Sequence, residues 1–143
     1  MKKGLEVEPT PVEGVVGDGV EIDVENRILR IKHTDYATLL WLVAKGLKNL
    51  TVYNRGNTTY LRPNKILKSA FFDEYGLLKV KALPITLSQV SYILHILSEA
   101  GLIDKVDSVY TLSRESPLWS VAKNSTPNEL AEFLLETIMT TEG

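Results

Sequence analysis

The residues of this sequence that could carry chemistry are few, and they favour hydrogen bonding over catalysis. The chain contains two histidines and no cysteine, which excludes thiol chemistry and thiolate zinc sites. His95 and Glu99 are one helical turn apart if their segment is a helix, but no third ligand stands at a suitable spacing. His33 belongs to a different segment. We therefore predict no metal site.

Recognised catalytic motifs are also missing from the sequence. It has no G-x-S-x-G motif, no Gly-rich phosphate loop, no H-E-x-x-H motif and no paired-carboxylate arrangement. We predict that the protein is not an enzyme, that it has no catalytic residues and that it uses no cofactor.

A polar stripe on one expected helix is the clearest candidate for a binding surface. Thr86 and Gln89 form a capping box, which predicts a helix with Thr86 as its N-cap and an end at Gly101. At 100° per residue, the apolar residues of this segment fall on one side and the polar residues on the other. The Gln89 side chain can also hydrogen-bond to a binding partner if it is not used in the capping box. The polar side contains Ser88, Ser91, Tyr92, His95 and Glu99.

Charge is concentrated in the middle of the chain, although the net charge is only −2. Residues 27–81 hold eleven Lys or Arg against three acidic residues, whereas residues 1–26 hold two against seven and residues 82–143 three against eight. A basic block of this kind suits contact with phosphate. The alternative is that the acidic ends fold back onto the basic middle. The candidate phosphate contacts are Lys65, Lys68, Lys79, Lys81, Arg55 and Arg62.

Length and composition fit one soluble domain. The chain has 143 residues, of which 44% are apolar, so it can bury a core without metals or disulfides. Its longest apolar run, residues 39–44, is far too short to span a bilayer, and no signal pattern opens the chain. We therefore expect a cytoplasmic protein without a membrane segment.

Periodicity and turn residues predict the elements that position these side chains. Residues 1–19 are expected to form a flexible arm, and residues 20–62 a strand-helix-hairpin extension packed on the core. Within the extension we expect a strand pair over 20–31, a helix over 35–47 buried on most sides, and a hairpin over 50–61 with its turn at 54–57. Further elements are a helix over 64–75, a short apolar element over 77–83, a hairpin around 107–108 and a capped helix over 126–140.

The expected 50–61 hairpin offers a second possible binding surface. It carries Tyr53 and Tyr60 together with Arg55 and Arg62, a combination that can stack on bases and bind phosphate. The same tyrosines are also good cross-strand packing residues. Single-stranded DNA or RNA is therefore a minor alternative ligand.

Residues 83–103 resemble the recognition-helix segment of winged-helix regulators such as the MarR, ArsR and PadR families. The resemblance is carried by Ser88, Val90-Ser91, Ile93-Leu94, Leu97 and the run Glu99-Ala100-Gly101-Leu102-Ile103. Residues 65–76 are similar to the first helix of the same motif, and residues 109–115 resemble the second wing strand and the start of the next helix. The match covers residues 63–116, under half of the chain.

This resemblance implies an α+β fold, a winged helix-turn-helix over residues 63–122 with the N-terminal extension and a C-terminal helix. It also implies a transcriptional regulator that reads duplex DNA through the 86–100 helix. Three features depart from the DNA-binding pattern. The polar helix face has no Lys or Arg, and the wing carries Asp104 and Asp107 around Lys105. Glu99 lies on the groove side, at the far end of the helix. The alternative function is a winged-helix module for protein–protein interaction in a larger assembly.

The apolar residues of the 126–140 helix spread over about two thirds of its circumference, more than one core-facing stripe needs. A homodimer through this C-terminal helix is the simplest use of a second apolar face. The alternative is a monomer that buries the whole helix in its own core.

Overall fold

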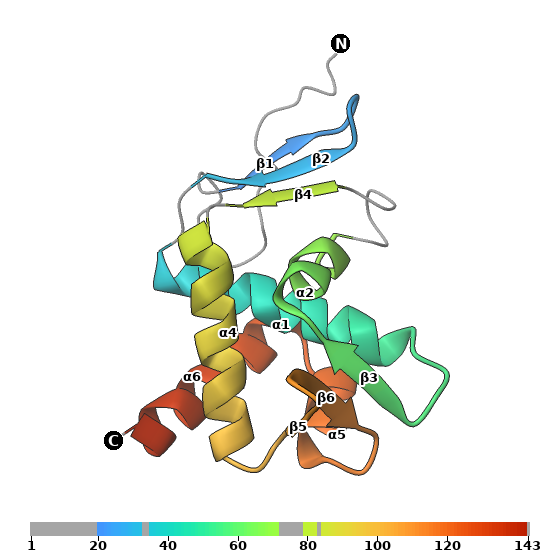
Figure 1. Ribbon diagram of the computed structural model, residues 1–143, viewed down its shortest axis with the longest axis vertical. Helices are drawn as coiled ribbons and strands as arrows, with labels where there is room; N and C mark the ends of the chain where they lie inside the picture. The colour runs from blue at the N-terminus through green and yellow to red at the C-terminus, as the bar shows by residue number, and fades with distance from the viewer. Residues whose placement is uncertain (1–19, 33–34, 72–78, 83, 143) are drawn as a thin grey trace.

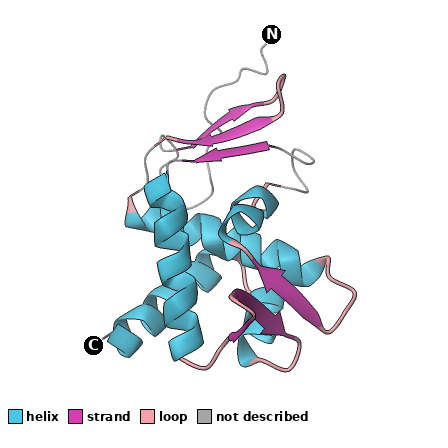
Figure 2. Cartoon of the chain, in the orientation of Figure 1, coloured by secondary structure: helices cyan, strands magenta, loops and turns pink. Residues whose placement is uncertain are grey.

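The computed structural model describes residues 20–32, 35–71, 79–82 and 84–142 (Figure 1). The fold is mixed α and β, as the sequence predicted. Five helices and two three-stranded sheets are present in the described part, and the sheets lie at different ends of the helical core (Figure 2). The expected N-terminal arm, residues 1–19, lies outside the described residues.

Helix α1 (Tyr36–Val52) is the centre of the core. It begins where the sequence predicted, because the Asp35 carboxylate accepts a hydrogen bond from the Thr38 backbone N–H at 2.8 Å and so caps the helix. Helices α2, α4, α5 and α6 all pack against it. This packing on several sides explains why apolar residues occur all round the helix, and it confirms the prediction of extensive burial.

The expected hairpin over residues 50–61 is wrong. Helix α1 continues through Leu50 to Val52, and only β3 (Thr58–Leu61) is a strand. Its partner lies about fifty residues further along the chain, with Tyr60 opposite Thr111. A short apolar segment is compatible with either a helix or a strand. Residues 50–52 are helical here because they continue the packed helix α1.

Strands β3, β5 (Asp104–Val106) and β6 (Val109–Ser113) form an antiparallel sheet in the order β3-β6-β5. The hairpin predicted around residues 107–108 is present. Asp107 and Ser108 both have positive φ, 51° and 69°, as a tight two-residue turn between strands requires. Leu61 and Leu112 are buried on the inner face of this sheet.

The second sheet contains β1 (Val20–Asp23), β2 (Ile28–Ile31) and β4 (Lys79–Ala82). Strands β1 and β2 are antiparallel, which confirms the expected strand pair, and β4 adds to β2 in parallel. At the β1–β2 turn the Asn26 amide and backbone N–H both donate to the Asp23 carboxylate, and these bonds hold the pKa of Asp23 below its ordinary value.

Strand β4 lies within the short apolar element that the sequence predicted over residues 77–83. The sequence Lys79-Val80-Lys81-Ala82 alternates, with both lysines exposed and Val80 and Ala82 half-buried against the core. That period of two matches a strand with one face covered. Pairing with β2, some fifty residues earlier, was not visible from the local sequence.

Helices α2 (Pro63–Ser69) and α4 (Pro84–Glu99) differ at their ends from the sequence expectations. Helix α2 ends at Ser69, where the Asn49 side-chain amide donates to the Ser69 carbonyl at 2.7 Å; residues 72–75 of the expected helix lie outside the described residues. Helix α4 starts at Pro84 and not after Thr86, because proline, which lacks an N–H, suits the first helical turn.

The C-terminal end of α4 is as predicted. Gly101 has a φ of +80°, its N–H donates to the Ser98 carbonyl at 3.0 Å, and the Leu102 N–H donates to the Leu97 carbonyl at 3.0 Å. These bonds form a Schellman motif, which satisfies the last carbonyls of the helix.

Helices α5 (Pro117–Asn124) and α6 (Pro127–Glu142) complete the core. The capping box at the start of α6 is confirmed. Thr126 Oγ1 accepts from the Glu129 N–H at 3.1 Å, and Glu129 Oε1 accepts from the Thr126 N–H at 2.9 Å.

Helix α6 packs against both α1 and α4, which explains the width of its apolar surface within one chain. Leu130, Leu134 and Ile138 are buried, and Phe133 is half-buried, while Met139 is 63% exposed. The broad second apolar face expected from the sequence is therefore largely covered by the protein itself. A homodimer through this helix stays a prediction.

The closest approach between helices lies where α1 crosses α2. A Cβ added at Gly46 would overlap the Ile66 carbonyl oxygen and come within 2.7 Å of Ile66 Cγ2. Only glycine allows the two helices to pack this closely.

We predict that Gly46→Ala lowers the free energy of unfolding by about 2 kcal/mol, because the α1–α2 crossing must open. Gly56→Ala is the matched control, since its Cβ would meet no described atom nearer than 3.5 Å. Urea denaturation of the three proteins measures both changes. Equal stability of Gly46→Ala and wild type would contradict the close crossing.

Candidate nucleic-acid interface

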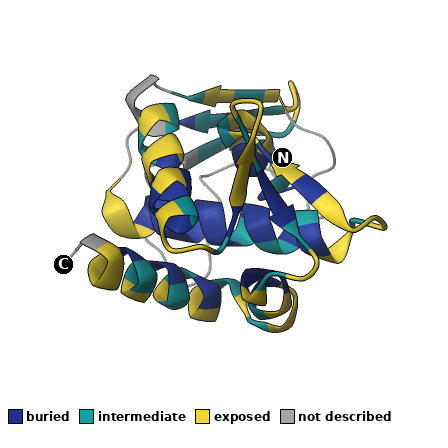
Figure 3. Cartoon of the chain, turned by 60° about the horizontal axis from the view of Figure 1, so that its bottom comes forward, coloured by how far each residue is buried: buried dark blue, intermediate teal, exposed yellow. Residues whose placement is uncertain are grey.

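Helix α4 presents the polar stripe that the sequence predicted. Its inner face is buried in the core, whereas Ser88, Ser91, Tyr92 and His95 are exposed on the outer face (Figure 3). Gln89 is half-buried at the edge of this stripe. The core-facing residues are Val90, Ile93, Leu94, Ile96 and Leu97.

The stripe has the dimensions and chemistry of a contact surface. Ser88 and His95 are seven residues apart, which corresponds to about 10 Å along the helix axis. The hydroxyl, phenol and imidazole groups can donate to phosphates or to base edges. His95 Nε2 lies 3.8 Å from Glu99 Oε2, and both side chains are more than half exposed. An exposed pair at this distance contributes little to stability.

The six candidate cations are divided among three parts of the structure. Lys65 and Lys68 lie on α2, and Arg62 immediately precedes that helix. Arg55 is exposed in the loop between α1 and β3. Lys79 and Lys81 are on the outer face of β4, in the other sheet. The structure therefore brings Lys65 near Lys68 and Lys79 near Lys81, but it does not gather all six on one element.

These six side chains are available for an anionic partner. Lys68 is half-buried and the other five are exposed, and none forms an ion pair in the part of the chain that the structure describes. The acidic N-terminal segment does fold onto the basic middle at one point, where Arg30 lies 3.6 Å from Glu21 and 3.9 Å from Asp23. That contact involves Arg30 and none of the six candidate phosphate-binding side chains.

Tyr53 and Tyr60 do not form the patch that the sequence suggested. Both are more than half exposed, but Tyr53 caps the end of α1 and Tyr60 lies on β3. They are not cross-strand neighbours, because the hairpin that would have paired them does not exist.

Two cations make contacts around the β3-β6-β5 sheet that the sequence analysis did not predict. The Arg114 guanidinium lies 5.0 Å from the centre of the Trp119 ring and donates to the Gly56 carbonyl at 2.9 Å. Lys105 on β5 stands over the Tyr110 ring at 5.3 Å. Gly56 is 58 residues from Arg114 in the chain, so only the tertiary fold brings them together.

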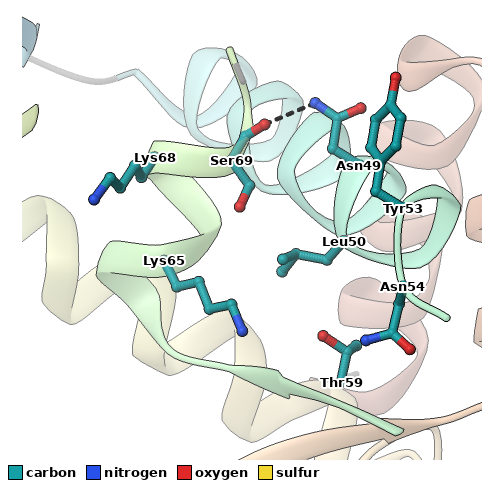
Figure 4. Close-up of a pocket in the computed structure, with 8 residues that line it drawn as sticks. All are labelled: Asn49, Leu50, Tyr53, Asn54, Thr59, Lys65, Lys68 and Ser69. Atoms are coloured by element: carbon teal, nitrogen blue, oxygen red, sulfur yellow. Dashed lines mark hydrogen bonds between the residues drawn. The ribbon is translucent and has the colours of Figure 1, made fainter. Parts of the chain in front are cut away.

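A cavity beside α2 contains polar residues that sequence analysis also missed. It lies between the end of α1, β3 and α2, and its volume is about 370 Å³ (Figure 4). Lys65 and Lys68 line it together with the buried Asn49 and Thr59. No motif marks Asn49 or Thr59, because their proximity arises from the packing of three separate elements.

No family model, curated protein or solved structure matches this chain. Across the described ranges, no group of three or more His, Asp or Glu side chains is placed to hold a metal ion. None of the helices described is long and apolar enough to cross a membrane.

The exposure of the α4 stripe predicts that its residues can be replaced without loss of the fold. Ser91→Ala and His95→Ala should each change the free energy of unfolding by less than about 0.5 kcal/mol, as is usual for surface positions. Leu94→Ala, on the buried face of the same helix, should cost about 3 kcal/mol. Thermal and urea denaturation measure all three, and a large loss in His95→Ala would show that the stripe is part of the core.

Proposed function

We propose that this protein is a winged helix-turn-helix protein that binds double-stranded DNA and acts as a transcriptional regulator. The observation that carries the proposal is the polar outer face of α4, whose N-terminal half holds Ser88 and Ser91 and whose C-terminal half holds Tyr92 and His95. In helix-turn-helix proteins the N-terminal part of the recognition helix contacts base edges in the major groove.

The order of elements supports the same proposal. Three helices, α1, α2 and α4, are followed by the β5–β6 hairpin, and β3 joins that hairpin to form a three-stranded sheet. This is the plan of a winged helix with α1 as its first helix. The sequence resemblance assigned the first helix to residues 65–76, which in this arrangement are the second. Residues 36–61 then belong to the winged helix itself.

In this proposal the exposed cations neutralise phosphates on either side of the groove. Lys65 and Lys68 lie on α2 and Arg62 immediately precedes it, while Lys79 and Lys81 are on β4, in the sheet near the start of α4 (Figure 1). Phosphate contacts of this kind fix the orientation of a protein on DNA and supply much of its affinity. Hydrogen bonds from the α4 stripe would supply the sequence preference.

A protein-interaction module is the second candidate function, and two observations favour it. The α4 stripe contains no Lys or Arg and ends at the exposed Glu99. The wing carries Asp104 and Asp107, both exposed. An uncharged helix face beside an acidic wing suits a protein partner better than a phosphate backbone.

A homodimer accompanies the DNA-binding proposal, because a two-fold protein would read a two-fold site. The exposed Met139 and half-buried Phe133 and Leu135 on α6 are the residues that a second copy would cover. Sedimentation equilibrium at several concentrations tests this, and a monomer at every concentration would remove the dimer from the proposal.

We predict a steep salt dependence of duplex binding, because six phosphate contacts release counterions. The log–log slope should be near −5, so affinity should fall by roughly a thousandfold between about 50 and 200 mM salt. Fluorescence anisotropy with random duplex, single-stranded DNA and RNA measures it. Weak binding to all three nucleic acids, with an affinity that does not change with salt, would overturn the DNA proposal. Capture of a stoichiometric, nuclease-resistant protein partner would support the interaction module.

Two pairs of variants separate the proposed roles of the side chains. Tyr92→Ala with His95→Ala should abolish sequence preference while nonspecific duplex binding remains. Lys65→Ala with Lys68→Ala should weaken binding to all duplexes alike and reduce the salt slope by about 2. For each double variant, affinity is measured for a duplex site selected with the wild-type protein and for random-sequence duplex. Indistinguishable effects of the two pairs would contradict this division of roles.

A further inference from the structure

The cavity between α1, β3 and α2 has the chemistry of a small-molecule site that does not depend on DNA binding. Its volume of about 370 Å³ lies within the range of small-ligand pockets. Among the residues that the structure describes, no acidic side chain lines it. It is therefore a basic cavity of the size of a small organic ligand.

Two buried polar side chains in the cavity wall have unused hydrogen-bonding groups. Asn49 is 7% exposed, and its amide N–H₂ donates to the Ser69 carbonyl, but its Oδ1 accepts no hydrogen bond from the described residues. Thr59 is 2% exposed, and its hydroxyl has no partner in the same part of the chain. Among the described residues, Trp41 Nε1 is the fully buried polar side-chain atom that lacks a partner, so solvent still reaches the Asn49 and Thr59 oxygens, and a ligand in the cavity could reach them too.

Charge and apolar surface occupy different parts of this cavity. In Figure 4 the Lys65 amino group is directed toward Thr59, so a cation and a hydroxyl donor lie at the same end of the cavity. The Leu50 side chain lies between this end and the Asn49 amide, and the Tyr53 ring stands on one side. A ligand that satisfied all of these groups would have an anionic end, a flat apolar body and a donor at its far end.

We propose that this cavity binds a nucleoside monophosphate whose base carries an exocyclic amino group. The phosphate would accept hydrogen bonds from the Lys65 ammonium and the Thr59 hydroxyl. The base would lie against Leu50 and the Tyr53 ring, as bases do on apolar and aromatic side chains. Its amino group would donate to Asn49 Oδ1, the acceptor that the fold leaves unused.

Isothermal titration calorimetry without DNA tests the proposal on the full chain, so its outcome does not depend on the DNA-binding proposal. The probes are CMP and UMP, which differ at the exocyclic group, and cytidine and inorganic phosphate, which each lack one half of CMP. We expect CMP to bind at least about tenfold more tightly than cytidine, phosphate or UMP. No binding of CMP at millimolar concentration, or equal binding of all four probes, would overturn the proposal.

Variants locate the bound ligand. Lys65→Met and Thr59→Val should each weaken CMP binding by about tenfold or more, because each removes a bond to the phosphate. Lys123→Met, at an exposed lysine on α5 that does not line the cavity, is the control for loss of one positive charge. Thermal melting of each variant establishes that the fold is retained. Equal losses in Lys65→Met and Lys123→Met would mean nonspecific attraction and would overturn the site.

Discussion

The burial of α1 is the constraint on which the rest of the structure depends. This helix is apolar on nearly every side, so it is stable in water only when other elements cover it all round. Helices α2, α4, α5 and α6 provide that cover. The contact with α2 is the most demanding, because the Gly46 backbone lies against the Ile66 carbonyl without room for a side chain. That crossing fixes where α2 and β3 lie.

Both candidate sites follow from this arrangement. Helix α4 uses its apolar face to cover the core, which leaves its polar face in solvent along the whole stripe from Ser88 to His95. The cavity exists because the end of α1 meets α2 and β3 without filling the space between them. Hydrogen bonds from the Asn49 amide to the Ser69 and Ala70 carbonyls join α1 to the end of α2 at the cavity wall. The site that would face DNA and the site for a small anion thus share α2 and its lysines.

Acidic and basic side chains lie mostly on different elements of the structure. On one sheet, Arg30 of β2 lies 3.6 Å from Glu21 and 3.9 Å from Asp23 of β1, a solvent-exposed contact that contributes little to stability. The candidate cations on α2 and β4 remain without ion-pair partners among the described residues. A near-neutral chain can therefore present separate basic surfaces, which the net charge alone conceals.

The sequence by itself determined the elements whose signals are local. The α1 start at Asp35, the turn at Asp107 and Ser108, the Thr126 capping box and the two faces of α4 all depend on residues within one or two turns of each other. Tertiary structure alone decided what pairs across long separations, which are β3 with β6, β4 with β2, and Arg114 with Gly56, and it placed Asn49 and Thr59 in the wall of one cavity. The physical reason is that alternation and capping are properties of a short segment, whereas strand partners and cavity walls depend on how a buried helix is covered.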